Sequence, residues 1–512
     1  MNWFDKKEKL SRRQLLKLVG AAGASAYLLP LVEQAYAQGI SIPDSGATLP
    51  SDNVTLRWVD SGDQKAVFFN EFFAAYQAAH PNIKVAYDPL PWNEIAQVVP
   101  LGIRNGTAHD VFQLPLSVSG AQAVSEGWVQ PLDDFIPNFA EWKAKFPPGI
   151  FLPGITDFEG KTYSFPFTSN KRYGTHLLYN KAIMEQAGYD PENEPLTWSS
   201  FREAAKKITE QGNGAYYGFI MGGNQINRWA DVVRGFGQMA GAVGGTGAQI
   251  TADMNFLTGE YSYNTEEYIA AVELLLQLRD DGSVFPGMLS INAPQARAFM
   301  PQGAAGMILQ GPWNIPQWER DNPEFDFGIS TQPLPDDGDV WPLAISEGGA
   351  NGLWIFKDSP NAAVAGDIFH YLGTLEGQTQ WANIVGAADP PVMPESIANA
   401  TLSPRAAQAL NMFNEQVKVG PNPVVRNPDI VQVTLEMRTP EPSFAQVIQG
   451  LYTGQLSDVK AQMQDVQDRY TAELERAIAA ANEKGADVSR DDWVFSNWDP
   501  RSDYGAEKYD EL

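Results

Sequence analysis

Aromatic and small polar side chains at the ends of predicted strands are the residues of this chain best placed to do chemistry. Asp60 and Asp63 follow the first predicted strand, and Gln113 ends the third. Trp313 comes directly after a Gly-Pro break behind a later strand. An indole ring stacks on the C–H face of a sugar ring, while carboxylate and amide oxygens bind its hydroxyls. These residue types predict a wall of a binding site for a carbohydrate-like solute.

The chain contains 14 tryptophans, and only some of them can line a binding site. Trp92 opens a helix after the second strand, and Trp229 lies in a helix that follows the strand at 217–221. Both join Trp313 as candidate ligand contacts, although a single tryptophan can equally fill a hydrophobic core. The tryptophans among helical apolar residues are assigned to packing, together with one near Trp313: Trp128, Trp142, Trp198, Trp381 and Trp318.

The motifs of common enzyme classes are missing from the sequence. There is no cysteine, which excludes disulfides, thiolate metal sites and cysteine nucleophiles, and the 4 scattered histidines lack metal-ligand spacing. The sequence has no G-x-S-x-G elbow, no H-E-x-x-H helix and no G-x-G-x-x-G loop behind a strand. We therefore expect a binding protein without cofactor or metal rather than an enzyme. A secreted hydrolase that uses two of the acidic residues is the alternative.

Length and charge limit the architecture and the partners. The chain has 512 residues, which is too many for one small core and predicts two or more lobes. Its formal net charge is −26. This charge argues against nucleic acid as a partner, because a phosphate backbone is bound by clustered lysine and arginine.

Residues 1–37 are predicted to be a twin-arginine signal peptide. Basic residues precede an apolar stretch at 18–32 that is too short to span a bilayer comfortably, and Ala-Tyr-Ala at 35–37 fits signal peptidase. The string Ser-Arg-Arg-Gln-Leu-Leu-Lys at 11–17 resembles the twin-arginine export signal. We expect export through that machinery, cleavage near Ala37, and a soluble periplasmic or other extracytoplasmic protein without a lipid anchor.

The elements that must position these residues alternate between strands and helices. Strands at 54–59, 83–87 and 110–114, with helices between them, predict right-handed βαβ units and a largely parallel sheet. Such sheets bind ligands outside the carboxyl ends of their strands, where Asp60 and Gln113 lie. Further strands and helices follow, and the body ends in a long helix predicted from Ser457 to about Lys484.

Four stretches, in this order, resemble the extracellular solute-binding proteins of ABC importers, the group typified by maltose-binding protein. The matching stretches are Leu-Leu-Tyr-Asn-Lys at 177–181 with the run 185–201, Gly-Met-Ile at 306–308 with Gly-Pro-Trp-Asn-Ile at 311–315, Gly-Gly at 348–349 with the strand 353–356, and Gln-Gly-Leu at 449–451 with the long helix behind it. Together they cover residues 54–480, nearly the whole mature chain.

The resemblance implies an α/β, type II periplasmic-binding-protein fold, in which two lobes joined by chain crossings close on a solute. The crossings are expected near 171–176, 326–333 and 386–392. The implied division is a leader at 38–52, lobe 1 at 53–172 and 334–388, lobe 2 at 173–333 and 389–484, and an acidic C-terminal tail at 485–512. The tail and the connection 133–168 exceed the usual pattern of the family.

The resemblance also implies ligand contacts and partners. Asp60 or Asp63 follows the first strand, Tyr173 lies at the first crossing and Trp313 at the Gly-Pro-Trp turn, with Gln113 and the pair Gly349 and Asn351 as looser matches. The implied function is a monomeric subunit that binds a sugar or oligosaccharide and delivers it to an ABC permease. A polyol phosphate, a peptide or another solute is the alternative, and the lack of a basic cluster in the sequence argues against the phosphate.

Overall fold

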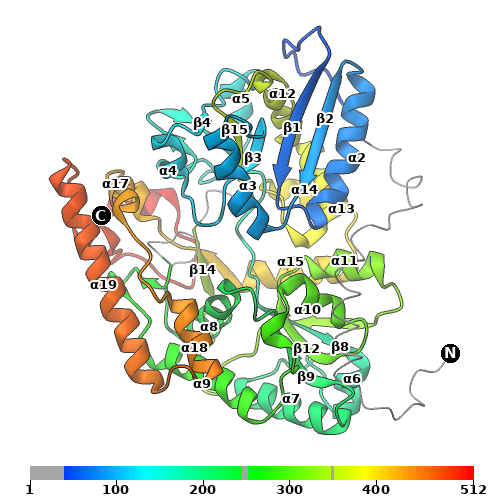
Figure 1. The fold of residues 1–512 in the computed structure, drawn as a ribbon, viewed down its shortest axis with the longest axis vertical. Coiled ribbons are helices and arrows are strands. Elements are labelled where there is room, and N and C mark those ends of the chain that lie inside the picture. Colours follow the sequence, from blue (N-terminus) through cyan, green and yellow to red (C-terminus); the bar gives the residue numbers. More distant parts are fainter. Residues whose placement is uncertain (1–39, 245–251, 347–350) are drawn as a thin grey trace.

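The chain folds into two lobes stacked along its long axis (Figure 1). This computed structural model describes residues 40–244, 252–346 and 351–512. The signal peptide and Gly349 therefore lie outside the described residues. Within the described ranges, no helix is both long and apolar enough to cross a membrane.

Lobe 1, the upper lobe in Figure 1, is built on a six-stranded sheet in the order β2-β1-β3-β15-β4, with β7 also paired to β15. β1, β2 and β3 are parallel, as the βαβ pattern predicts, whereas β15 runs antiparallel to β3, β4 and β7. The strands are β1 (Val54–Asp60), β2 (Ile83–Pro89), β3 (Val111–Gln113), β4 (Val129–Gln130), β7 (Ser164–Phe165) and β15 (Leu353–Phe356). The helices of this lobe are α2 (Gln64–Ala79), α3 (Trp92–Asn105), α4 (Gly120–Ser125), α5 (Phe139–Lys143), α12 (Ala362–Leu372), α13 (Leu375–Val385) and α14 (Pro394–Asn399).

The core of lobe 1 is aromatic. α2 contributes Phe68, Phe69 and Phe72, all without exposed surface, because apolar residues at helical spacing put them on one face. The Phe69 ring contacts Trp58 of β1, and the Phe68 ring contacts Trp381 of α13. This packing fixes the start of α2, and with it the loop that follows β1.

Lobe 2 is built on a four-stranded sheet in the order β13-β8-β12-β9. β12 is parallel to β9 but antiparallel to β8, so this sheet is mixed. Its strands are β8 (His176–Asn180), β9 (Tyr217–Ile220), β12 (Ala305–Gln310) and β13 (Phe327–Ser330). Its helices before the crossing are α6 (Lys181–Ala187), α7 (Trp198–Gly212), α8 (Asn227–Met239), α9 (Glu266–Asp280), α10 (Ala293–Phe299) and α11 (Asn314–Asp321).

Two boundaries between the lobes differ from those expected. β14 (Leu343–Ile345) pairs with β16 (Val417–Val419), and all three of its residues are buried with lobe 2 side chains. The chain therefore stays on lobe 2 beyond residue 334. On the return path, α14 packs against α13 of lobe 1, so lobe 1 extends past residue 388. Both differences arise because short segments near a crossing follow local apolar contacts that sequence periodicity does not reveal.

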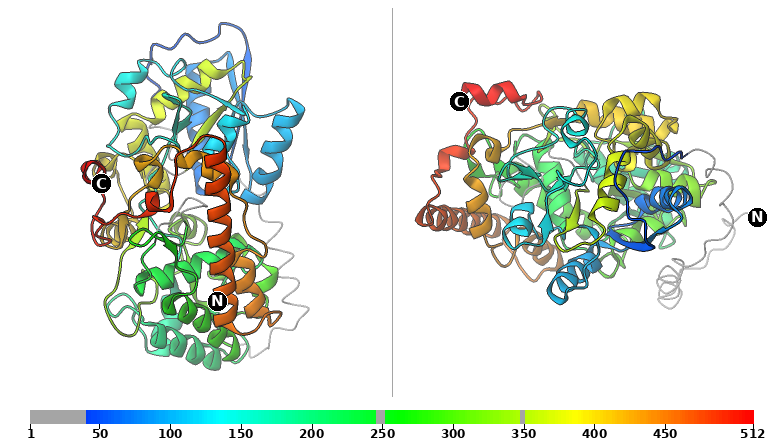
Figure 2. Two further views of the ribbon diagram at one scale, coloured as in Figure 1. Left: turned by 90° about the vertical axis from the view of Figure 1, so that its left-hand side faces the viewer. Right: turned by 90° about the horizontal axis from the view of Figure 1, so that it is seen from above.

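The C-terminal region wraps one side of lobe 2 (Figure 2). Its elements are α15 (Pro404–Gln416), α16 (Pro423–Arg426), α17 (Ile430–Glu436), α18 (Phe444–Thr453) and α19 (Val459–Glu483). The acidic tail after α19 is anchored by buried Trp493, Phe495, Trp498 and Tyr504. These side chains join the same core as α19, so the tail is part of lobe 2. At the other end of the chain, Ile40, Ile42 and Leu49 of the leader pack on lobe 1.

Replacing Trp493 by alanine is expected to lower the free energy of unfolding by about 3–5 kcal/mol, since it removes a fully buried indole from this core. Urea unfolding followed by fluorescence measures the change. Asp510→Ala, at an exposed position in the same tail, is the control and should change stability little. Equal stability of both variants would mean that the tail does not belong to the core.

Candidate functional site

The loops that follow the parallel strands of lobe 1 face the upper surface of lobe 2 (Figure 1). Asp63, behind β1, forms an ion pair of 2.7 Å between its Oδ2 and Nη2 of Arg297 in α10. Gln64 accepts a hydrogen bond of 2.9 Å from Arg320 of α11. Polar contacts thus join the two lobes directly at the strand ends, and we define this junction as the seam.

Asp63 is held in an unusual backbone conformation. It precedes α2 with φ 60 and ψ −131, in the left-handed region that side chains rarely adopt. Such strain concentrates at functional positions. Burial alone would raise the pKa of Asp63, but the Arg297 guanidinium outweighs it and holds that pKa below its usual value. Asp63 is therefore an anion at neutral pH.

Asp60 is fully buried, and its carboxylate is used by the protein itself. It accepts hydrogen bonds from Trp58 Nε1 at 3.0 Å, from the Gly62 amide at 2.7 Å and from the Tyr87 hydroxyl at 2.9 Å. Burial raises the pKa of Asp60, an effect that the charge of Lys65 opposes. Asp60 has no exposed surface, and its hydrogen bonds hold the loop after β1 in shape.

Gln113 and Asn351 form a polar chain behind the seam. The Gln113 side chain accepts from the Ser61 amide at 2.7 Å and donates to Asn351 Oδ1 at 3.2 Å. Asn351, with φ 53, donates in turn to Asp389 at 2.8 Å. The structure therefore brings both predicted residues together, as supports of the loop after β1.

Asp389 is the shared carboxylate partner of two cationic side chains near the crossing. Its carboxylate pairs with Arg172 and lies 3.8 Å from Lys65 Nζ. The Arg172 guanidinium also lies 5.7 Å from the centre of the Trp313 ring. Asp389, its two cationic partners and Trp313 therefore form one electrostatic cluster where the crossing meets the seam.

Trp313 lies at the seam. It follows β12 in lobe 2, yet its partly buried indole packs against the aromatic core cluster of lobe 1. Gly311 and Gly174 leave room for the ring, because a Cβ on Gly311 would lie 2.1 Å from an indole carbon and one on Gly174 would lie 3.1 Å away. Trp318 is buried in lobe 2, in agreement with its assignment to packing.

The other aromatic candidates lie elsewhere. Trp229 is a correction: it has no exposed surface, donates to the Gly223 carbonyl at 3.0 Å and packs on Tyr452 in the lobe 2 core. Tyr173 is at the crossing, but its hydroxyl donates to Gln416 at 2.6 Å and its ring is buried with Phe413. Trp92 opens α3 and is partly buried on lobe 1.

Two buried arginines of the seam were missed by the sequence analysis. Arg228, one residue before Trp229, donates to the carbonyls of Gly174 and Leu309 and lies 3.2 Å from Asp231. Burial lowers the pKa of Arg228, Asp231 opposes this shift, and the charge of Arg297 adds to it. Among the described residues, neither Arg228 Nε nor Arg297 Nε has a hydrogen-bond partner. Arginine in a helix is usually solvated, so the sequence gives no signal for these two.

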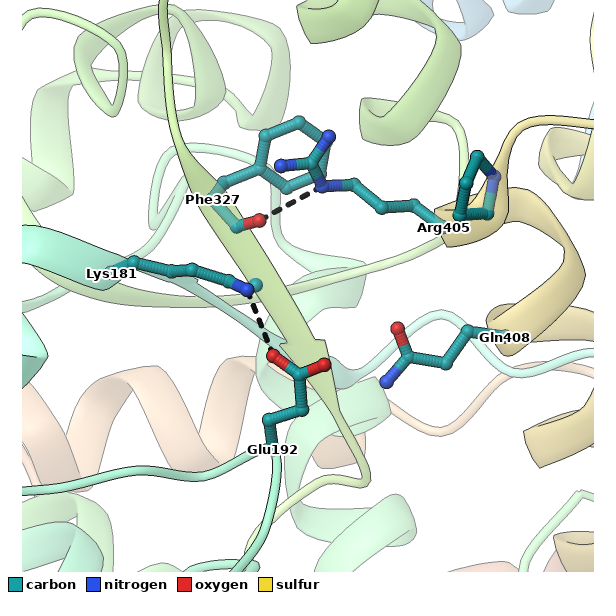
Figure 3. Close-up of a pocket in the computed structure, with 7 residues that line it drawn as sticks. Lys181, Glu192, Phe327, Arg405 and Gln408 are labelled. Atoms are coloured by element: carbon teal, nitrogen blue, oxygen red, sulfur yellow. Dashed lines mark hydrogen bonds and ion pairs between the residues drawn. The ribbon is translucent and has the colours of Figure 1, made fainter.

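The cavity in Figure 3, of about 190 Å³, is not part of the seam. It lies where Asn180 of β8 meets Phe327 of β13, whereas the crossing adjoins the other end of β8. Its charged groups pair with one another, Lys181 with Glu192 at 2.8 Å, while Arg405 donates to the Phe327 carbonyl at 2.9 Å. A second cavity of about 180 Å³, beside Tyr452, is lined by lobe 2 alone.

Over residues 40–244, 252–346 and 351–512, no cluster of three or more acidic or histidine side chains could hold a metal.

Comparison with known proteins gives the family. The sequence model described as bacterial extracellular solute-binding protein matches residues 61–379, more than half of the chain. This chain belongs to that family. A Brucella abortus relative, named only as a binding protein, is 25% identical over 338 residues, which cover 65% of this chain and 75% of the relative. The sn-glycerol-3-phosphate-binding periplasmic protein UgpB of Agrobacterium fabrum is 26% identical over 55% of this chain and 59% of its own length.

Solved structures of solute-binding proteins share the two-lobed fold. An ABC transporter solute-binding protein from Thermotoga lettingae, bound with α-D-tagatose, aligns with a TM-score of 0.63 at 19% identity and covers 83% of this chain and 100% of its own. The Thermus thermophilus maltotriose-binding protein aligns with a TM-score of 0.58 at 21% identity, over 83% and 100% of the two chains. The predicted resemblance and the type II binding-protein fold are confirmed.

The Asp63–Arg297 pair is expected to contribute about 1 kcal/mol of coupling energy, because Asp63 keeps 32% of its side chain exposed and water screens it. A double-mutant cycle of Asp63→Asn and Arg297→Gln, followed by urea unfolding, measures this energy. The lowered folded-state pKa of Asp63 means that the coupling is fully present above the unfolded pKa of about 3.9 and is lost as the pH falls from there through the folded-state pKa. Additive effects at pH 7 would contradict the pairing.

Proposed function

We propose that this member of the solute-binding family is the extracytoplasmic subunit of an ABC importer that binds a sugar or oligosaccharide between its lobes and delivers it to the permease. Trp313 carries this proposal, since it reaches from lobe 2 to lobe 1 beside charged groups of both. A flat indole and polar side chains are what a sugar ring requires on its face and at its rim. Two similar proteins, one bound with α-D-tagatose and one named as a maltotriose-binding protein, support the same solute class.

In this mechanism the solute selects the closed arrangement of the lobes. It contacts side chains of both lobes only when they are together, so binding energy favours closure. The closed surface then docks on the permease. Asp63, Arg297 and Trp313 act as contacts at the seam, while Asp60, Gln113 and Asn351 hold the loop behind it. Gly349 stays a candidate from its sequence neighbourhood.

Export, location and assembly follow from the sequence. Residues 1–37 carry the twin-arginine pattern, so the precursor crosses the membrane folded and is cut near Ala37. The mature protein then works as a periplasmic or other extracytoplasmic monomer. Comparing its N-terminal sequence after export in strains with and without the twin-arginine machinery tests this route.

Replacing Trp313 by alanine is expected to weaken solute binding by about 1–3 kcal/mol, through lost stacking and apolar contact. Isothermal calorimetry against mono- and oligosaccharides first identifies a bound sugar and then compares the variant. Trp198→Ala, at a partly buried tryptophan of lobe 2 that is assigned to packing, is the control and should keep the affinity. Binding of no glycan or polyol by the parent protein would reject the proposal, and turnover of a bound glycan would indicate a hydrolase.

An acidic solute, such as a polyol phosphate, is the second candidate. It is favoured by the buried Arg228 and Arg297, whose Nε atoms have no partner among the described residues, and by the UgpB relatives named for sn-glycerol 3-phosphate. The structure thereby weakens the sequence argument that no basic cluster is present. Hydrogen bonds from a guanidinium to an anion contribute about 1.5–3 kcal/mol each.

Calorimetry with sn-glycerol 3-phosphate and glycerol, and with glucose 6-phosphate and glucose, separates the two candidates. If the solute is acidic, only the phosphorylated member of a pair binds, and Arg228→Gln weakens it roughly tenfold or more. Lys460→Gln, at an exposed position far along the chain, is the charge-matched control. Equal binding of neutral and phosphorylated members would exclude an anion site.

A further inference from the structure

α16 and α17 contact both lobes at a place where the chain does not pass from one lobe to the other. On one side they belong to lobe 2, because Ile430 and Val433 have no exposed surface and lie in its core. The tail holds them there. Arg426 donates to the Asp491 carbonyl at 2.8 Å, Asn427 donates to the Asp487 carbonyl at 2.9 Å, and Asp429 accepts from the Asp487 amide at 2.9 Å.

The other side of the same segment packs on lobe 1. Val431 and Leu435 are partly buried against an apolar cluster of lobe 1 that includes Phe112 and Phe158. The contact is close, since a Cβ on Gly154 of lobe 1 would lie 2.2 Å from Val424 and 2.6 Å from Val431. α17 lies beside α4 of lobe 1 at the left of Figure 1.

The spacing explains how one short helix serves both lobes. Ile430 and Val433 are three residues apart and share the face toward lobe 2, whereas Val431 and Leu435 are four apart and share the neighbouring face. The lobe 2 face has buried side chains and tail hydrogen bonds, but the lobe 1 face has partly buried apolar contacts. When the lobes separate, α17 is therefore expected to lose its weaker contact with lobe 1 and to stay attached to lobe 2.

We propose that α17 is a clasp, a lobe 2 helix whose Val431 and Leu435 hold lobe 1 in the closed arrangement before any solute binds. The clasp favours closure by the apolar area that it covers and slows opening, so it sets how readily the site admits and releases its solute. This inference depends on the two-lobed fold and its hinge, and not on the identity of the solute.

The absence of native cysteine allows a direct test in the mature protein without added solute. Cysteines replace exposed Asp358, behind β15 in lobe 1, and exposed Lys460, near the start of α19 in lobe 2. Spin labels on this pair report the distance between the lobes by pulsed electron resonance. The distance distribution is compared between the parent, Leu435→Ala and the double variant Val431→Asp, Leu435→Asp.

The parent is expected to show mainly the short distance of the closed structure. The double variant should raise the ratio of long to short distances roughly fivefold to thirtyfold, because two apolar contacts are lost, and Leu435→Ala should give a smaller rise. Gln432→Asp, at an exposed position on the same helix, is the matched control and should leave the distribution unchanged.

Two outcomes overturn the clasp. One is a parent protein that already shows the long distance without solute. The other is a distribution that stays the same in Leu435→Ala while circular dichroism and thermal unfolding show a folded protein. Leu435→Ala removes apolar contact without adding charge, so it tests the clasp even if the double variant fails to fold.

Discussion

Arg297 of lobe 2 is almost fully buried, and its charge is compensated by Asp63 from the other lobe. Burying an unpaired guanidinium costs several kcal/mol, so the pair favours the arrangement in which the lobes meet. Other charges near the seam are paired within one lobe or at the crossing: Asp389 pairs with Lys65 and Arg172, and Asp231 pairs with Arg228. Under the proposed function, a solute that enters the seam replaces part of this pairing with its own polar groups, so the proposed site requires a polar ligand.

The predicted residues at the seam fall into two groups, because some contact the other lobe and others support the loop after β1. Asp63 and Trp313 contact the opposite lobe, whereas Asp60 and Gln113 accept hydrogen bonds from the backbone of the loop after β1. Hydrogen bonds from Trp58 and Tyr87 occupy Asp60 so completely that its role is to shape the turn. A strained Asp63 is then presented by a rigid loop, as a preorganised contact requires.

The fold could be predicted from the sequence because strand-helix alternation and the order of several loose motifs act over the whole chain. The Gly-Pro-Trp turn also predicted the position of Trp313, since glycine is required where the indole covers the backbone. Trp229 was wrong as a ligand contact, because helical periodicity does not tell which neighbour of an apolar face is fully enclosed. Arg297 was missed because its partner Asp63 is 234 residues away, and no local pattern encodes such a pair.

Binding of a solute at the seam can be seen in a crystal structure of the protein purified from its native host with the solute that it retains. If the solute binds at the seam, electron density for a small polar molecule lies between the lobes, against the Trp313 ring and within hydrogen-bond distance of Asp63, Arg297 or Arg228. Density in the cavity lined by Lys181 and Arg405 would contradict it, as would a solute that touches one lobe alone.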